Sequence, residues 1–168
     1  PYVKRSSIET RVSQWKNAPD RKLEVISWKY SALGEPDALG IIKADNGTVL
    51  QIYHRFARGI YLGDLIEIYG EPGEVSVARN PDGSVVYGFV YPHKGIQCVG
   101  IGKPARSDSR FAELSVNIRI TDISFFPSMM SLKEYYTTLL GFSEDIATRS
   151  AQTGNPWPGL GTRIEIPE

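Results

Sequence analysis

Two largely apolar segments joined by an Asn-Gly turn constrain the fold more than any other feature of the sequence. Residues 39–44 and 49–56 flank Asp45-Asn46-Gly47-Thr48. Asn and Gly tolerate the two positive φ angles of a type I′ turn, and the twist of this turn matches that of the antiparallel strands it joins. The sequence therefore predicts a β-hairpin here, and the rest of the fold must accommodate an antiparallel sheet.

Three segments carry apolar residues at helical spacing. In residues 62–69 they recur every three or four positions, and Gly70 follows as a common helix terminator. Ser6-Ser7-Ile8-Glu9 and Ser131-Leu132-Lys133-Glu134 are capping-box patterns, each ahead of further apolar residues at the same spacing. We therefore expect short amphipathic helices over residues 8–15, 62–69 and 132–140.

A second turn and further apolar segments predict more strands. Residues 75–79 and 84–91 flank Asn80-Pro81-Asp82-Gly83, in which Pro and Gly favour a turn, and residues 96–101 follow closely. These three segments predict an antiparallel meander. Strands are also expected where apolar and polar residues alternate, at 23–30 and 114–123.

Together these elements predict an α+β fold, an antiparallel sheet of hairpins and meanders with a few short helices, in a single compact domain over residues 1–168. Gly34-Glu35-Pro36 recurs as Gly70-Glu71-Pro72, a shift of 36 residues, and the two hairpin turns keep the same shift. We interpret this as a degenerate two-fold repeat, and a chance coincidence of common turn residues is the alternative. The expected order is repeat units 21–57 and 58–101, a strand and helix over 111–141, and an irregular tail over 142–168.

The charge balance and the hydropathy of the chain argue against nucleic acid and membranes as binding partners. Lys plus Arg and Asp plus Glu each total 19, so the chain has no net charge to attract nucleic acid or an anionic membrane surface. A run of about 18 apolar residues, which a membrane span needs, is not present in the sequence. The chain begins at Pro1 rather than Met, which suggests that an N-terminal part was removed.

The sequence contains no recognisable catalytic or metal-binding set. Cys98 is the one cysteine, and its apolar neighbours predict a buried side chain rather than a nucleophile. His54 and His93 are distant in sequence and belong to no His-Glu-x-x-His pattern, so a zinc site is not expected. We therefore predict a non-enzymatic protein without a metal or a cofactor.

An excess of aromatic residues, 9 tyrosines and 3 tryptophans, points to binding. Their rings combine a large contact area with a polar group. For some of these rings the core is the favoured place, because Tyr87 and Tyr91 share one face of the second hairpin and Trp157 can fold back over the core edge. Pro156-Trp157-Pro158 also fits a ligand for an aromatic groove of a partner. The candidate binding residues are Trp28, Tyr53, Tyr87, Tyr91 and Trp157.

Residues 62–72, Leu-Gly-Asp-Leu-Ile-Glu-Ile-Tyr-Gly-Glu-Pro, lead from a predicted helix into the meander. With the strands up to Ile101, this segment resembles the BamE/SmpA-like small domains of bacterial envelope lipoproteins, and residues 33–56 are a fainter second copy. In that family a helix closes with Leu-Gly-x-Pro before a three-stranded antiparallel sheet, and here Tyr69-Gly70-Glu71-Pro72 takes that place. The family usually has two helices before the sheet, whereas one is expected here.

The resemblance implies an extracytoplasmic, non-enzymatic domain, in the cell envelope or secreted, with a lipid-bearing cysteine upstream of Pro1. Cys98 lies too deep in the domain to be that cysteine. The first hypothesis is accordingly that the chain binds another envelope protein through a sheet face or edge. The alternative is a module that binds a small ligand or glycan with aromatic residues between the two repeat units.

Overall fold

The computed structural model describes residues 4–15, 18–31, 38–103, 110–152 and 154–167. The strands are β1 (Lys4–Trp15), β2 (Ala18–Ser31), β3 (Ala38–Asp45), β4 (Thr48–Tyr61), β5 (Glu74–Arg79), β6 (Val85–Tyr91), β7 (Ile96–Gly102), β8 (Phe111–Glu113), β9 (Arg119–Phe125), β10 (Asn155–Pro156) and β11 (Arg163–Glu165). Nine of them form one antiparallel sheet in the order β1-β2-β3-β4-β9-β7-β6-β5-β10, and β8 pairs with β11 separately.

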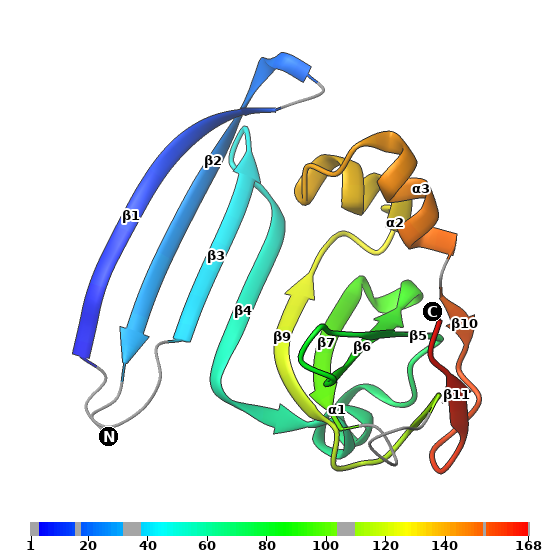
Figure 1. Cartoon of the computed structure of the whole chain (residues 1–168). Coiled ribbons are helices and arrows are strands. Elements are labelled where there is room, and N and C mark those ends of the chain that lie inside the picture. Colours follow the sequence, from blue (N-terminus) through cyan, green and yellow to red (C-terminus); the bar gives the residue numbers. More distant parts are fainter. Residues whose placement is uncertain (1–3, 16–17, 32–37, 104–109, 153, 168) are drawn as a thin grey trace.

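Short helices complete the fold. They are α1 (Leu62–Tyr69), the 3₁₀ turn η1 (Pro92–Lys94), α2 (Leu132–Glu134), its π-helical continuation η2 (Tyr135–Leu139) and α3 (Glu144–Gln152). The predicted α+β class, with an antiparallel sheet and short helices, is confirmed. Figure 1 shows β1–β4 as a curved layer that extends away from the helices, with α2 and α3 near one end of β9 and α1 near the other.

The local predictions for the centre of the chain are confirmed. Asn46 and Gly47 adopt φ angles of 48° and 76°, and the β3–β4 ladder runs from Asp45↔Thr48 to Leu39↔Arg55. Helix α1 has the predicted bounds, and β5, β6 and β7 form the predicted meander. These elements depend on turn residues and on apolar spacing within a few positions, which is information that the local sequence carries.

The main hydrophobic core lies on one face of the sheet. Phe89, Cys98 and Ile120 point into it from β6, β7 and β9 and are fully buried. Helix α1 covers this face through Leu62 and Leu65, and the small β8–β11 sheet contributes further apolar side chains. Because buried apolar surface contributes roughly 25 cal/mol per Å², burial of this cluster stabilises the packing of α1 and the β8–β11 sheet against the large sheet.

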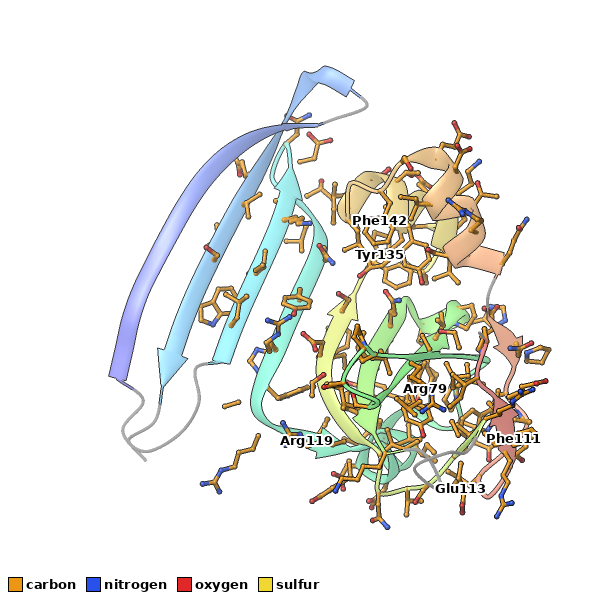
Figure 2. The ribbon with its side chains drawn as sticks, viewed as in Figure 1. Arg79, Phe111, Glu113, Arg119, Tyr135 and Phe142 are labelled. Carbon is orange, nitrogen blue, oxygen red and sulfur yellow. The ribbon has the colours of Figure 1, made fainter. Side chains whose placement is uncertain are left out.

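A second, smaller core joins the helical segment to the opposite face of the sheet. Phe126, Tyr135, Leu139 and Ala147 are buried together, and Leu50 of β4 packs against them. Figure 2 shows the side chains of Tyr135 and Phe142 on the side of the helices that faces the sheet. The segment α2–η2–α3 is therefore a cap over one end of this sheet face.

The helix predicted for residues 8–15 is wrong, because this segment is strand β1, paired with β2 from Lys4↔Ser31 to Trp15↔Ala18. Ile8 and Val12 are separated by four positions, a spacing that fits a helical stripe and also fits one face of a strand. Thr10 between them makes an alternating β-branched series, which favours extended backbone. The ladder with β2 supplies the hydrogen bonds that a helix would have made within itself.

The strand predicted for residues 114–123 is interrupted. β8 ends at Glu113, and the Ile118 amide then donates to the Ser115 carbonyl at 3.1 Å to close a turn before β9. The carbonyls of Val116 and Ile118 accept from the first amides of α1, at 3.0 and 2.9 Å. The turn therefore supplies acceptors for the first backbone amides of α1, which have no hydrogen-bond partner within the helix.

The tail over residues 142–168 is not irregular throughout. It contains α3, whose Ala147 is buried and whose first turn holds two acidic residues that suit a helix N-terminus. The Gly- and Pro-rich remainder forms two short strands at sheet edges, and the Trp157 amide donates to the Gly73 carbonyl at 3.0 Å. Proline is tolerated at such edges because it need not donate to a ladder.

The two-fold repeat stays a prediction. The hairpin of the first unit follows strand β2, whereas the hairpin of the second follows helix α1. The first Gly-Glu-Pro turn, residues 34–36, lies outside the described residues. The structure also places one helix directly ahead of the β5–β7 meander, with strand β4 before it.

Substitution of Leu65 by Ala tests the role of α1 in the main core. Leu65 is 1% exposed, so truncation should leave a cavity and lower the free energy of unfolding by about 2–5 kcal/mol. Ile68→Ala on the same helix is the matched control, because Ile68 is 69% exposed and should change stability by less than about 0.5 kcal/mol. Urea unfolding measures both, and equal losses would contradict this account of the core.

Candidate functional site

A cavity of about 470 Å³ lies between the sheet and the helical cap. Its sheet side is formed by residues of β4, β5, β7 and β9, and its other side by η2 and the residues up to α3. Small-molecule sites typically have volumes of about 300–1,000 Å³ and combine apolar walls with a few convergent polar groups. This cavity has both kinds of wall and is the candidate site.

The polar wall is organised around Asp122 of β9. Its Oδ1 accepts from Arg55 Nε at 2.9 Å and from the Tyr53 hydroxyl, and its Oδ2 accepts from Thr121 Oγ1 at 2.7 Å. Arg55 stands directly opposite Asp122 in the β4–β9 ladder, so backbone pairing fixes the ion pair. The Asp122 side chain is 14% exposed and that of Arg55 is 56% exposed, which leaves the guanidinium open to solvent.

The electrostatics of this cluster keep Tyr53 neutral and Arg55 charged. Burial, followed by the hydrogen bond to Asp122, raises the pKa of Tyr53 to about 12. The hydrogen bond and the charge of Asp122 raise the pKa of Arg55 above its usual range. The cluster therefore presents a hydroxyl, a guanidinium and a carboxylate at neutral pH, with little net charge.

The aromatic wall comes from the cap. The rings of Tyr136 and Phe142 stack, with centroids 5.8 Å apart and planes 9° from parallel. Gln97 Nε2 of β7 donates to the Tyr136 hydroxyl at 2.9 Å, which attaches this wall to the sheet. Phe142 is 37% exposed, so part of its ring is accessible.

The buried side-chain amide of Gln51 links the helical cap to the sheet by hydrogen bonds. Gln51 of β4 is 2% exposed, and its Nε2 donates to Ser124 Oγ and to the Tyr135 hydroxyl, both at 3.1 Å. The Lys43 ammonium of β3 also donates to the Leu139 carbonyl, and burial lowers the pKa of this lysine. These bonds hold the aromatic wall at a fixed position over the sheet, so the cavity is largely pre-formed.

The structure separates the five predicted binding residues. Tyr53 lines the cavity. Tyr87 and Tyr91 are 1% and 2% exposed in the main core, so their rings offer no binding surface. Trp157 packs edge-on against Phe89, with ring centroids 6.0 Å apart, as a cover for the core edge.

Trp28, the fifth predicted residue, lies on β2 opposite Gly40 of β3. A Cβ atom at Gly40 would fall 2.1 Å from the Trp28 ring, so the ring occupies the space above this glycine. Cross-strand packing of an aromatic ring over a glycine stabilises a sheet. Trp28 is thus a packing residue of the β2–β3 ladder, away from the residues that line the cavity.

The groups that sequence reasoning missed are Arg55, Asp122, Gln97, Tyr136 and Phe142. One signal was available, because Asp122 interrupts the apolar series of β9 in a strand that is central in the sheet. A charged residue in such a strand needs a partner. Its partner Arg55 lies 67 positions away, and only the register of β4 against β9 brings the two together.

The described residues offer binding groups rather than a reactive pair. His54 packs edge-on against Phe56 at 4.7 Å, and burial lowers its pKa. Burial raises the pKa of Cys98 to about 12, so its thiol is protonated and inaccessible. In the described ranges, three or more His, Cys, Asp or Glu side chains do not converge to hold a metal ion, and no helix has the length and hydropathy to cross a bilayer.

Cys98 should react with a thiol reagent only after unfolding. The thiolate is the reactive form, and a raised pKa together with full burial removes it from the native protein at pH 8. Reaction with 5,5′-dithiobis(2-nitrobenzoate) should be at least about 100-fold slower in buffer than in urea. Equal rates would show that the main core around Cys98 is open.

Stability should fall as the pH rises from about 10 to about 12. Tyr53 and Tyr135 have folded pKa values of about 12, above the value of about 10 in the unfolded chain, so the folded state binds more protons in this window. Tyr53→Phe removes one such group. The decrease in urea midpoint between about pH 9 and about pH 11 should be smaller in this variant than in the wild type, and an unchanged decrease would contradict the burial of Tyr53.

Comparison with protein-family models, with curated proteins and with solved structures gives no match to this chain.

Proposed function

We propose that this chain is a non-catalytic binding module whose cavity takes a small, neutral, polyhydroxylated ligand such as a sugar. The observation that carries the proposal is the Asp122–Arg55–Tyr53 cluster on one wall of the cavity, with the stacked Tyr136–Phe142 rings on another. Hydroxyl groups both donate and accept hydrogen bonds, so they suit a wall with a carboxylate acceptor beside guanidinium and phenol groups.

Charge and shape support a neutral ligand. Arg55 and Asp122 are paired at 2.9 Å and compensate each other, so neither an anion nor a cation gains strongly from the cluster. The exposed part of the Phe142 ring offers an apolar face against which the C–H groups of a sugar ring can pack. The volume of about 470 Å³ is within the range of small-molecule sites.

Protein interaction is the second candidate, and a different part of the sheet favours it. Ile26, Ile42 and Ile52 stand in one row across β2, β3 and β4, on one face of the sheet. Ile26 and Ile52 are 37% and 42% exposed, and Figure 1 shows this part of the sheet extending away from the helices. An exposed apolar row of this kind is typical of an interaction surface. The partner in this proposal is another envelope protein, and the envelope or secreted location and a lipid anchor upstream of Pro1 rest on the BamE/SmpA resemblance alone.

Ligand titration with site variants tests the first proposal. Glucose, galactose, N-acetylglucosamine and maltose are titrated into the ¹⁵N-labelled protein, and shifts of the Tyr53, Gln97 and Asp122 amides are followed. Asp122→Asn and Phe142→Ala should each weaken binding about tenfold or more. Asp122→Asn removes the charged acceptor for a ligand hydroxyl, and Phe142→Ala removes the apolar contact with the ligand.

Phe111→Ala is the control, since Phe111 is 45% exposed on β8, which contributes no residue to the cavity lining. This variant should bind as tightly as the wild type. Thermal unfolding of all three variants separates lost binding from lost structure. If none of the four sugars shifts these amides at about 10 mM, or if Phe111→Ala and Phe142→Ala weaken binding equally, the cavity is not a sugar site.

A further inference from the structure

Strand β1 is an open edge of the large sheet. It is the first strand in the sheet order, and β2 is its one neighbour among the described residues. It runs for 12 residues, Lys4–Trp15, without a proline. A long edge strand presents a row of unpaired amide and carbonyl groups that can pair with another strand.

The middle of β1 is regular enough to act as a template. From Ser7 to Gln14 each residue pairs with successive residues of β2, from Lys29 to Lys22, without a shift in register. The irregularities lie outside this run, between Arg5 and Ser7 and between Gln14 and Trp15. Ser7–Gln14 is therefore an uninterrupted extended edge.

The residues of this run are symmetric about Thr10. Ser7 and Ser13, Ile8 and Val12, and Glu9 and Arg11 are equally far from Thr10 on its two sides. The three symmetric pairs are thus two serines, two β-branched apolar residues, and an acidic with a basic residue. Such a segment is complementary to a second copy of itself in antiparallel orientation.

The geometry of an antiparallel ladder restricts how two copies can pair. Alternate residues of an edge strand direct their amide and carbonyl groups outward, so residues opposite each other must have the same orientation. A two-fold axis must then pass through a residue and not between two residues. With the axis at Thr10, Glu9 of each copy stands opposite Arg11 of the other, and Ile8 stands opposite Val12.

Neighbouring registers are electrostatically unfavourable. With the axis at Glu9 the two copies of Glu9 oppose each other, and with the axis at Arg11 the two copies of Arg11 do so. With the axis at Ile8, Arg5 opposes Arg11. Like charges directly opposite each other destabilise a strand pair, so the register centred on Thr10 is favoured over these three. An axis at Ser7 or at Val12 would instead extend the pairing across the irregularities that bound the run Ser7–Gln14.

We infer that two copies of this chain associate through antiparallel pairing of β1 with β1, across a two-fold axis at Thr10. The inference names a second copy of this chain as a partner of the same sheet region, separately from the envelope-protein partner proposed above, and it does not depend on the cavity. Thr10 pairs with Ile26, which starts the row of Ile26, Ile42 and Ile52. In the dimer the two isoleucine rows lie in line across a continuous sheet, with the two Thr10 residues between them.

Charge reversal at Glu9 and Arg11 tests this register. Sedimentation equilibrium should give the wild type a mass of about twice 18.7 kDa. Glu9→Arg alone and Arg11→Glu alone should each sediment as monomers, because each places like charges opposite each other at two positions of the symmetric dimer. An equimolar mixture of these two variants should regain the dimer mass, as should the double variant Glu9→Arg/Arg11→Glu, because opposite charges then face each other again.

The matched control is Glu24→Arg, which makes the same charge change at an exposed residue one strand further in, on β2. It should stay dimeric, and far-UV circular dichroism verifies that each variant keeps its strands. A monomeric wild type, dimeric single variants, or a mixture that stays monomeric would each overturn the inference. Sugar titration of the single variants is a separate measurement. A loss of dimer mass with unchanged sugar binding, or the reverse, therefore shows which of the two proposals is contradicted.

Discussion

The pairing of β9 with both β4 and β7 is the constraint on which the rest of the structure depends. This strand joins the curved layer β1–β4 to the β5–β7 meander, and neither half would share a sheet without it. Side chains alternate along a strand, and β9 also has a register shift against β7 at Thr121, which changes the face that the following residues occupy. Ile120 and Ile123 therefore both enter the main core, whereas Asp122 and Ser124 face the cavity and the helical cap.

The two faces of β9 require different covers, and this explains why a cavity exists. Apolar side chains of α1 close over the first face. The second face carries the Asp122 carboxylate of β9 beside the buried Gln51 amide of β4, and an apolar cap would leave these polar groups without hydrogen-bond partners. The cap therefore meets the sheet through hydroxyl groups, those of Tyr135 and Tyr136, and stops short of Arg55, whose guanidinium keeps access to water.

The parts of the fold that follow from short-range patterns could be predicted from the sequence, namely the Asn46-Gly47 hairpin, α1 and the meander. The segment around Ile8 and Val12 could not, because their spacing fits a helix and a strand equally well and β2 decides between them. The same limit applies to the site. Tyr53 could be named from its chemistry, but its partner Asp122 is 69 positions away and depends on the β4–β9 register. Tyr87 and Tyr91 have the same chemistry as Tyr53, and their shared face on the hairpin left core and binding roles both open until the packing of the meander placed them in the core.

The charged residues of β1 both disfavour pairing with other strands and favour one specific dimer over aggregation. Charged residues on an edge strand normally protect it, because most registers with another strand bury them unpaired or opposite a like charge. Glu9 and Arg11 have this effect on the registers centred on Glu9, Arg11 and Ile8, whereas in the register centred on Thr10 they attract each other across the interface. The same two residues thus oppose open-ended growth and favour a closed pair, since a two-fold contact uses the β1 edge of both copies. The opposite end of the sheet is β10, a strand of two residues that includes Pro156, and it is too short and too poor in donors to extend the array.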